Sequence, residues 1–242
     1  MSDDVRAELA PTGELRAGVN LSNFLLVTGK APNGDPEGVS PSLARAIAER
    51  LGVPVRYVTY PRPNLLADAA GAGEWDIGLI GAEPARAEKI AFTPAYAEIE
   101  STYLVPAGSP IRTLAEVDRP GVRIAVAAGA AYDLWLDRNI TNAELVRAPT
   151  IDASFEIFVD RQLDVLAGLR PRLLTDVEKL PGARILDGSF SAVQQAVGTA
   201  KTNAAGAAFL RDFVEEAKSS GLIERLIRQF GVEGKLSVAG RA

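Results

Sequence analysis

The chain of 242 residues contains neither cysteine nor histidine. Without cysteine it has no disulfides and no thiol nucleophile, and without either residue it lacks the ligands of the usual zinc sites. Without histidine it cannot use an acid–base mechanism that depends on an imidazole. We therefore expect neither a metal site nor a cofactor.

Positive charge and long apolar segments are also scarce. The net charge is −5 at pH 7, and no basic stripe exists to neutralise phosphates, which argues against nucleic acid as a partner. No apolar run approaches the ~18 residues that cross a bilayer. The first residues, MSDDVRAELAP, contain neither the basic nor the apolar part of a secretory signal. If the protein is exported, we expect this form to lack its signal peptide, and we expect a monomer.

Apolar segments of strand and helix type alternate along the chain, which favours an α/β fold with mainly parallel strands. The strands are expected at 15–19, 55–59, 77–80, 123–127, 165–167 and 193–197. Helices are expected at 40–52, 64–70, from 132 to 138, at 153–162 and in two amphipathic C-terminal segments. Ser40 and Asn64 are the expected N-caps of the first two helices.

The segment Trp75–Tyr96 is the most informative part of the chain. A short apolar run ends at Gly81, and Glu83, Pro84 and Arg86 follow it. This order predicts a buried strand, a tight turn and a short helix with a cation in its first turn. Free N–H groups and the helix dipole favour an anion at such a junction, and the arginine fork matches a carboxylate.

This segment resembles the signature of the family 3 extracellular solute-binding proteins, the amino-acid and opine receptors of bacterial ABC importers. Segments 13–20 (GELRAGVN), 38–52 (GVSPSLARAIAERLG) and 121–129 (GVRIAVAAG) resemble other motifs of this family in the same order. Segment 221–231 resembles its C-terminal helix. The resemblance covers about residues 13–238.

The resemblance implies a two-lobed α/β fold of the type II periplasmic-binding-protein kind, with a ligand cleft between the lobes. Residues 1–104 plus 194–242 would form the first lobe and residues 105–193 the second. Two hinge segments, near 103–106 and 192–196, would let the lobes close around a ligand. The family also implies a periplasmic location and a permease partner in the inner membrane.

The resemblance gives Arg86 the role of gripping the ligand carboxylate. Glu83, beyond Gly81, has three open roles: it caps the helix, pairs with Arg86 or faces the cleft. In the second lobe, Gly129, Ala130 and Ala131 stand where relatives often have hydroxyl residues. We expect this turn to offer the ligand free backbone N–H groups only.

A second departure from the family lies at the end of the strand near 165–169. Leu169 stands where amino-acid receptors place an aspartate that binds the α-ammonium group. Either Glu83 replaces this charge or the ligand has no α-amino group, because a buried ammonium without a carboxylate is costly. Arg170 either adds a positive contact or faces solvent. The remaining candidates for ligand contact are Asn20, Asn23, Phe24, Tyr132 and Gln194.

The leading hypothesis is a binding protein, not an enzyme, that captures a small carboxylate-bearing solute for an ABC importer. Two alternatives stay open. One is an enzyme similar to cyclohexadienyl dehydratase, with Glu83 as the proton donor. The other is the sensor module of a receptor.

Overall fold

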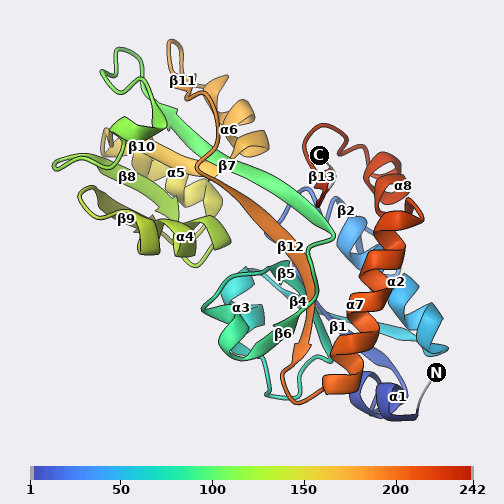
Figure 1. Cartoon of the computed structure of the whole chain (residues 1–242). Coiled ribbons are helices and arrows are strands. Elements are labelled where there is room, and N and C mark those ends of the chain that lie inside the picture. Colours follow the sequence, from blue (N-terminus) through green and yellow to red (C-terminus); the bar gives the residue numbers. More distant parts are fainter. Residues whose placement is uncertain (1–2, 241–242) are drawn as a thin grey trace. The chain divides into compact units, whose positions relative to one another are not determined.

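A computed structural model describes residues 3–240, which divide into two compact units. The first unit comprises the chain up to Glu98 and from Gln194 onward, and the second comprises Ile99–Val193. The chain passes between them along β7 (Ala97–Val105) and β12 (Ser191–Ala200) (Figure 1).

The first unit contains a mixed sheet in the order β4-β1-β5-β12. Its strands β1 (Leu15–Asn20), β4 (Val55–Tyr60) and β5 (Ile77–Gly81) are parallel, and β12 is antiparallel to β5. Short strands β6 (Ile90–Phe92) and β13 (Ser237–Val238) pair with β12 and with the start of β7. A small hairpin joins β2 (Gly29–Lys30) and β3 (Pro36–Glu37). The parallel strands end at one edge, which therefore collects the residues after β1 and β5.

Helices cover the first unit's sheet. They are α1 (Asp3–Leu9), α2 (Val39–Leu51), α3 (Pro63–Asp68), the 3₁₀ turn η1 (Arg86–Glu88), α7 (Ala204–Ser219) and α8 (Leu222–Gln229). Helix α7 packs against α1, and α8 packs against α2 (Figure 1). The expected apolar stripe of α2, formed by Leu43, Ile47 and Leu51, is fully buried.

Both expected N-caps in this unit are wrong. Helix α2 begins after Gly38, whose φ is 147° and whose added Cβ would lie 2.2 Å from the Leu26 carbonyl oxygen. Ser40 instead lies inside the helix and exchanges a hydrogen bond with the Tyr96 hydroxyl at 2.9 Å. Helix α3 begins at Pro63, because proline at the first position needs no N–H partner, and so Asn64 lies within its first turn.

The second unit contains the sheet β7-β10-β8-β9, to which β11 (Arg184–Ile185) adds on β7. Strands β8 (Arg123–Ala127), β9 (Glu144–Ala148) and β10 (Val165–Leu169) are parallel, whereas β7 is antiparallel to β10. Its helices are the 3₁₀ turn η2 (Leu114–Glu116), α4 (Ala131–Asn139), α5 (Ile151–Asp160) and α6 (Arg170–Val177). The expected helix at 153–162 begins two residues earlier, where Thr150 accepts a hydrogen bond from the Ala153 N–H at 3.0 Å.

Candidate functional site

Arg86 lies in the turn that follows β5. This strand is entirely buried and ends at Gly81, after which the chain turns into η1. The Arg86 side chain folds back, and its Nη1 donates a hydrogen bond to the Gly81 carbonyl at 2.7 Å. Arg86 is only 6% exposed, so a permanent positive charge is held inside the end of the strand.

Burial lowers the pKa of Arg86 from its ordinary value to about 10. The charges of Glu83 and Asp68 act in the opposite direction and raise this pKa, but the loss of hydration is the larger effect. The guanidinium is therefore protonated at neutral pH in surroundings that do not fully compensate its lost hydration. A ligand carboxylate would supply additional negative charge at this position.

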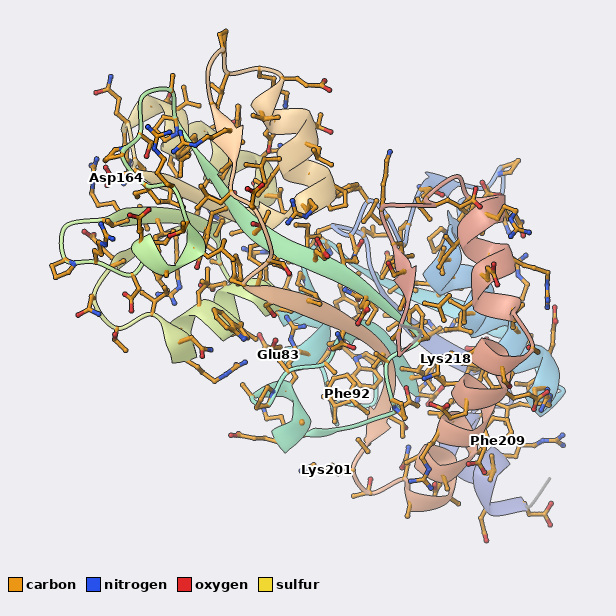
Figure 2. All side chains as sticks on the ribbon, turned by 45° about the horizontal axis from the view of Figure 1, so that its top comes forward. Glu83, Phe92, Asp164, Lys201, Phe209 and Lys218 are labelled. Atoms are coloured by element: carbon orange, nitrogen blue, oxygen red, sulfur yellow. The ribbon has the colours of Figure 1, made fainter. Side chains whose placement is uncertain are left out.

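Gly81, Glu83 and Gln194 share this part of the first unit with Arg86. Gln195 lies opposite Gly81 in the β5–β12 pairing, and the Ala82 N–H donates to the Gln194 carbonyl at 2.7 Å. The Gln194 side chain donates to Glu98 at 3.0 Å. Figure 2 shows Glu83 on the turn after β5. The turn that carries Arg86 is therefore hydrogen-bonded to strand β12.

The loop after β1 carries the next three predicted residues. Asn20 accepts hydrogen bonds from the Ser22 N–H and hydroxyl at 3.2 and 2.8 Å. Asn23, which is buried, accepts bonds from the N–H groups of Leu25 and Leu26. Both asparagine oxygens thus shape the loop, whereas the Phe24 ring is 37% exposed. Since β1 and β5 are parallel neighbours, Asn20 and Gly81 end their strands at the same edge.

The predicted turn at Gly129 differs from the expectation. The Gly129 N–H is not free, because it donates to Oδ2 of Asp133 at 2.9 Å. Asp133 is 3% exposed, and its Oδ1 accepts a hydrogen bond from Nε of Arg147 at 2.9 Å. A carboxylate of the chain itself therefore occupies a donor that we expected to serve the ligand.

The residues after Gly129 form the start of α4. Ala130 is the N-cap of the helix and makes no side-chain cap. Ala131 and Tyr132 are buried, and burial raises the pKa of the Tyr132 hydroxyl. Tyr132 lies in the first turn of α4, and its contact with a ligand stays a prediction.

Arg170 is the first residue of α6 and is held within the second unit. Its Nε lies 2.6 Å from Oε2 of Glu100, and its Nη2 donates to the Gly188 carbonyl. It is therefore not a free solvent-facing arginine, and its contact with a ligand stays a prediction. Leu169, the residue before it, is buried at the end of β10.

Sequence reasoning missed two groups in the second unit. One is the cluster of Asp133, Arg147 and Asp137, in which Arg147 also pairs with Asp137 at 2.5 Å. The only sign of this cluster in the sequence was Asp133, an acid in the first turn of a helix that follows Gly129. The other is a cluster of three rings, in which Phe190 stacks on Tyr103 at 4.5 Å and lies tilted to Trp135 at 5.2 Å between centroids. These rings come from separate segments, so no local sequence pattern predicted their contact.

Among residues 3–240, no group of three or more His, Cys, Asp or Glu side chains could hold a metal ion. No helix in the same residues is long and apolar enough to span a membrane.

The profile of the bacterial extracellular solute-binding proteins, family 3, matches residues 16–233. A search of curated protein sequences found no match. Among solved structures, one similar chain is a putative binding component of an ABC transporter from Wolinella succinogenes, complexed with lysine. It is 20% identical with a TM-score of 0.75, and the match covers 93% of this chain and 98% of that one.

Two further structures show how varied such relatives are. An ancestral amino-acid-binding protein, described as a precursor of cyclohexadienyl dehydratase, is 21% identical with a TM-score of 0.73, over 92% of this chain and 97% of that one. A histidine kinase sensor domain is 19% identical with a TM-score of 0.75, and the match covers 93% of this chain and 97% of that one. These likenesses confirm the predicted α/β fold of the type II periplasmic-binding-protein kind, and at such identities they show the fold alone.

Proposed function

Because this chain belongs to family 3 of the bacterial extracellular solute-binding proteins, we propose that it is the substrate-binding component of an ABC importer. It captures a small carboxylate-bearing solute in the periplasm by hinge closure and delivers it to a permease in the inner membrane. It works as a monomer and without chemical turnover.

The observation that carries the proposal is the buried Arg86. A guanidinium that is 6% exposed, with a pKa lowered to about 10 by burial, is costly to maintain for structure alone. Its planar fork can form two parallel hydrogen bonds with a carboxylate, and these charge-assisted bonds are strong in a desolvated position. The role we propose for Arg86 is therefore recognition of the ligand's negative charge.

The second unit supports a ligand other than a standard L-α-amino acid bound in the usual manner. Leu169 offers no charge to an α-ammonium group, and Ala130 and Ala131 offer no hydroxyls. The N–H of Gly129 already serves Asp133. The solute we propose is a carboxylate with an apolar or aromatic body. The competing possibility is that Glu83 binds an amine of the ligand.

The proposal is tested by a thermal-shift screen of organic acids, amino acids and opines, followed by calorimetric titration. A ligand at 100 times its Kd adds about 2.7 kcal/mol of stability. Arg86→Met should weaken binding by about 2–5 kcal/mol, since the carboxylate would lose its partner in a desolvated position. Arg86→Lys should recover part of this loss, because it restores the charge without the fork.

Arg56→Met is the matched control. Arg56 lies in the same unit and pairs with Glu14, but its side chain is 52% exposed. Binding that survives Arg86→Met with less than about tenfold loss would contradict the assignment. Tight binding of common amino acids that is lost in Glu83→Gln would instead establish Glu83 as the ammonium partner.

The enzymatic alternative rests on Glu83, which lies close enough to Arg86 to raise the pKa of the guanidinium. A carboxylic acid in a binding site can protonate a leaving hydroxyl, which is the step that a dehydratase catalyses. Turnover of a cyclohexadienyl substrate that disappears in Glu83→Gln would favour this function over simple binding.

A further inference from the structure

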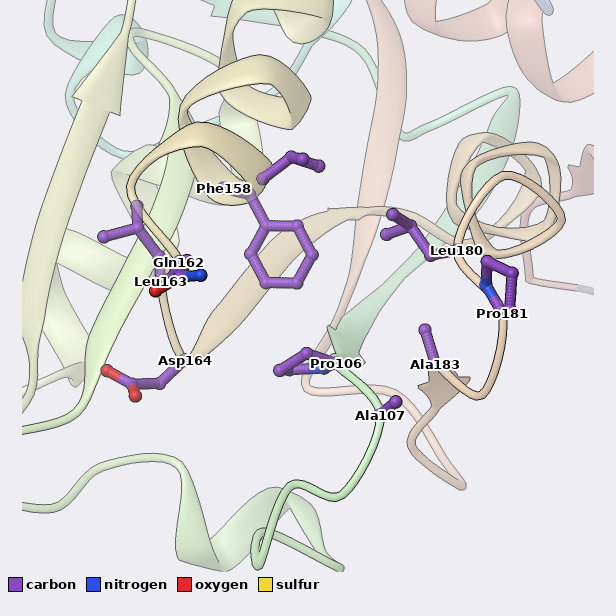
Figure 3. Close-up of a pocket in the computed structure, with 10 residues that line it drawn as sticks. Pro106, Ala107, Phe158, Gln162, Leu163, Asp164, Leu180, Pro181 and Ala183 are labelled. Carbon is purple, nitrogen blue, oxygen red and sulfur yellow. The ribbon is translucent and has the colours of Figure 1, made fainter.

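A cavity of about 420 Å³ lies within the second unit, where the end of β7, the end of α5 and the turn before β11 meet. Figure 3 shows the Phe158 ring facing Pro106, with Leu180 and Pro181 on the adjoining side. The lining residues are Pro106, Ala107, Phe158, Val159, Gln162, Leu163, Asp164, Leu180, Pro181 and Ala183. The volume falls in the range of about 300–1,000 Å³ that is typical of small-molecule sites.

The lining of this cavity is mostly apolar and partly rigid. Phe158 and Leu163 are each 3% exposed and belong to the core of the unit, so these walls are fixed. Val159 at the margin is 40% exposed, which makes it one of the few large apolar side chains open to solvent in the described residues. A ring compound would bury apolar surface between Phe158 and the two proline rings.

Gln162, at the edge of the cavity, has an unusual backbone. Its φ is +48°, the only positive φ of a non-glycine residue between 3 and 240. Gln162 ends α5 by donating its N–H to Val159, while Leu163 donates to Phe158, the hydrogen-bond pattern of a helix end that usually takes glycine. A glycine would make the same two bonds without the steric cost, so glutamine stands here against the local backbone preference.

The surroundings hold the Gln162 backbone and leave its amide available. Arg123 Nη2 donates to the Gln162 carbonyl at 2.7 Å, and Arg123 also binds the Asp164 carboxylate. The Asp164 side chain points away from the Phe158 ring (Figure 3). Within residues 3–240 the Gln162 side-chain amide makes no hydrogen bond. It is therefore the polar group that a ligand in the cavity could engage.

We propose that this cavity is a second binding site, for a small aromatic compound that carries one hydroxyl or ring N–H. The ring occupies the space between Phe158 and Pro106, and its donor bonds to the Gln162 side-chain oxygen. The lining residues all belong to the second unit, whereas Arg86 belongs to the first, so the site is independent of the carboxylate site.

Indole is the probe, titrated into the full chain and followed by amide NMR. We expect saturable shifts at the amides of residues 158–163 and 180–183, the segments that line the cavity. Ala183→Phe places a ring inside the cavity and should weaken indole binding by at least about tenfold. Leu174→Phe is the matched control, because Leu174 is 51% exposed on α6 and does not line the cavity.

Gln162→Gly provides a second test, which does not require the protein to fold with a larger side chain in the cavity. It should raise the melting temperature by a few degrees, because the strain at positive φ is relieved. It should also weaken indole binding about threefold to tenfold by removing one hydrogen bond. A purely structural role for Gln162 would leave indole affinity unchanged.

The absence of saturable shifts, or shifts of equal size in Ala183→Phe, would overturn the proposal. Arg86→Met should not alter the indole titration. A failure of the carboxylate site and a failure of this site can therefore be told apart.

Discussion

Replacement of Arg86 by methionine should stabilise the ligand-free protein while it destroys carboxylate binding. Burial lowers the pKa of this guanidinium well below its ordinary value, to about 10, so the folded protein holds the proton less tightly than the unfolded chain. At about 1.36 kcal/mol for each tenfold change in proton affinity, this difference corresponds to a cost of about 3 kcal/mol. Because the folded pKa is the lower one, the cost is fully present below about pH 10 and disappears as the pH rises toward the pKa of the unfolded chain.

Methionine removes this cost but also removes the hydrogen bond from Arg86 to the Gly81 carbonyl. Leaving a buried carbonyl without that donor costs about 1–2 kcal/mol. The net expectation for Arg86→Met is a gain of about 1–2 kcal/mol at pH 7, which corresponds to about 2–8 °C in melting temperature for a chain of this size.

Arg16 provides the opposite case within the same unit. Its Nη2 and Nε donate to the two oxygens of Asp76 at 2.6 and 3.0 Å, and the Asp76 side chain is only 3% exposed. Arg16→Met would leave this carboxylate buried without its cation, which should cost about 3–5 kcal/mol. Substitution by methionine should therefore raise the free energy of unfolding at Arg86 and lower it at Arg16.

Urea unfolding of the ligand-free protein at pH 7 measures both variants against the parent chain. The midpoint should rise for Arg86→Met and fall for Arg16→Met with little change in slope. A loss of more than about 1 kcal/mol in Arg86→Met would refute the reasoning, because the arginine would then stabilise the empty protein and its burial would need no ligand to explain it.

Two further predictions concern buried contacts. Asp133→Asn should destabilise the protein by about 2–4 kcal/mol in urea unfolding, because it removes the charge that Arg147 pairs with beside the Gly129 turn; an unchanged midpoint would show that the pair is dispensable. Gly38→Ala should lower the melting temperature by well over about 4 °C, since a Cβ would lie 2.2 Å from the Leu26 carbonyl oxygen at a φ of 147°; a scanning calorimetry trace like that of the parent would contradict the close approach.

Local patterns predicted many elements of this chain, but helices α1 and α6 and strand β9 were not among those expected. The strands at 77–80 and 123–127 and the apolar stripes of the C-terminal helices all appear, because burial of one face imposes a period of two or 3.6 residues on the sequence. The positions of caps were predicted less well. Whether Ser40 or Gly38 begins α2 depends on the approach of Leu26 and Tyr96, which lie far from it along the chain.

The sequence alone determined the α/β class, the family and the buried strand that ends at Gly81 before Arg86, since these depend on periodicity and on motifs within short segments. Only the tertiary structure decided which charges are satisfied. The pairing of Asp133 with Arg147, and of Arg170 with Glu100, joins separate elements of the fold. An ion pair forms where the chain brings two side chains together and water is displaced, and neither condition can be derived from residue order.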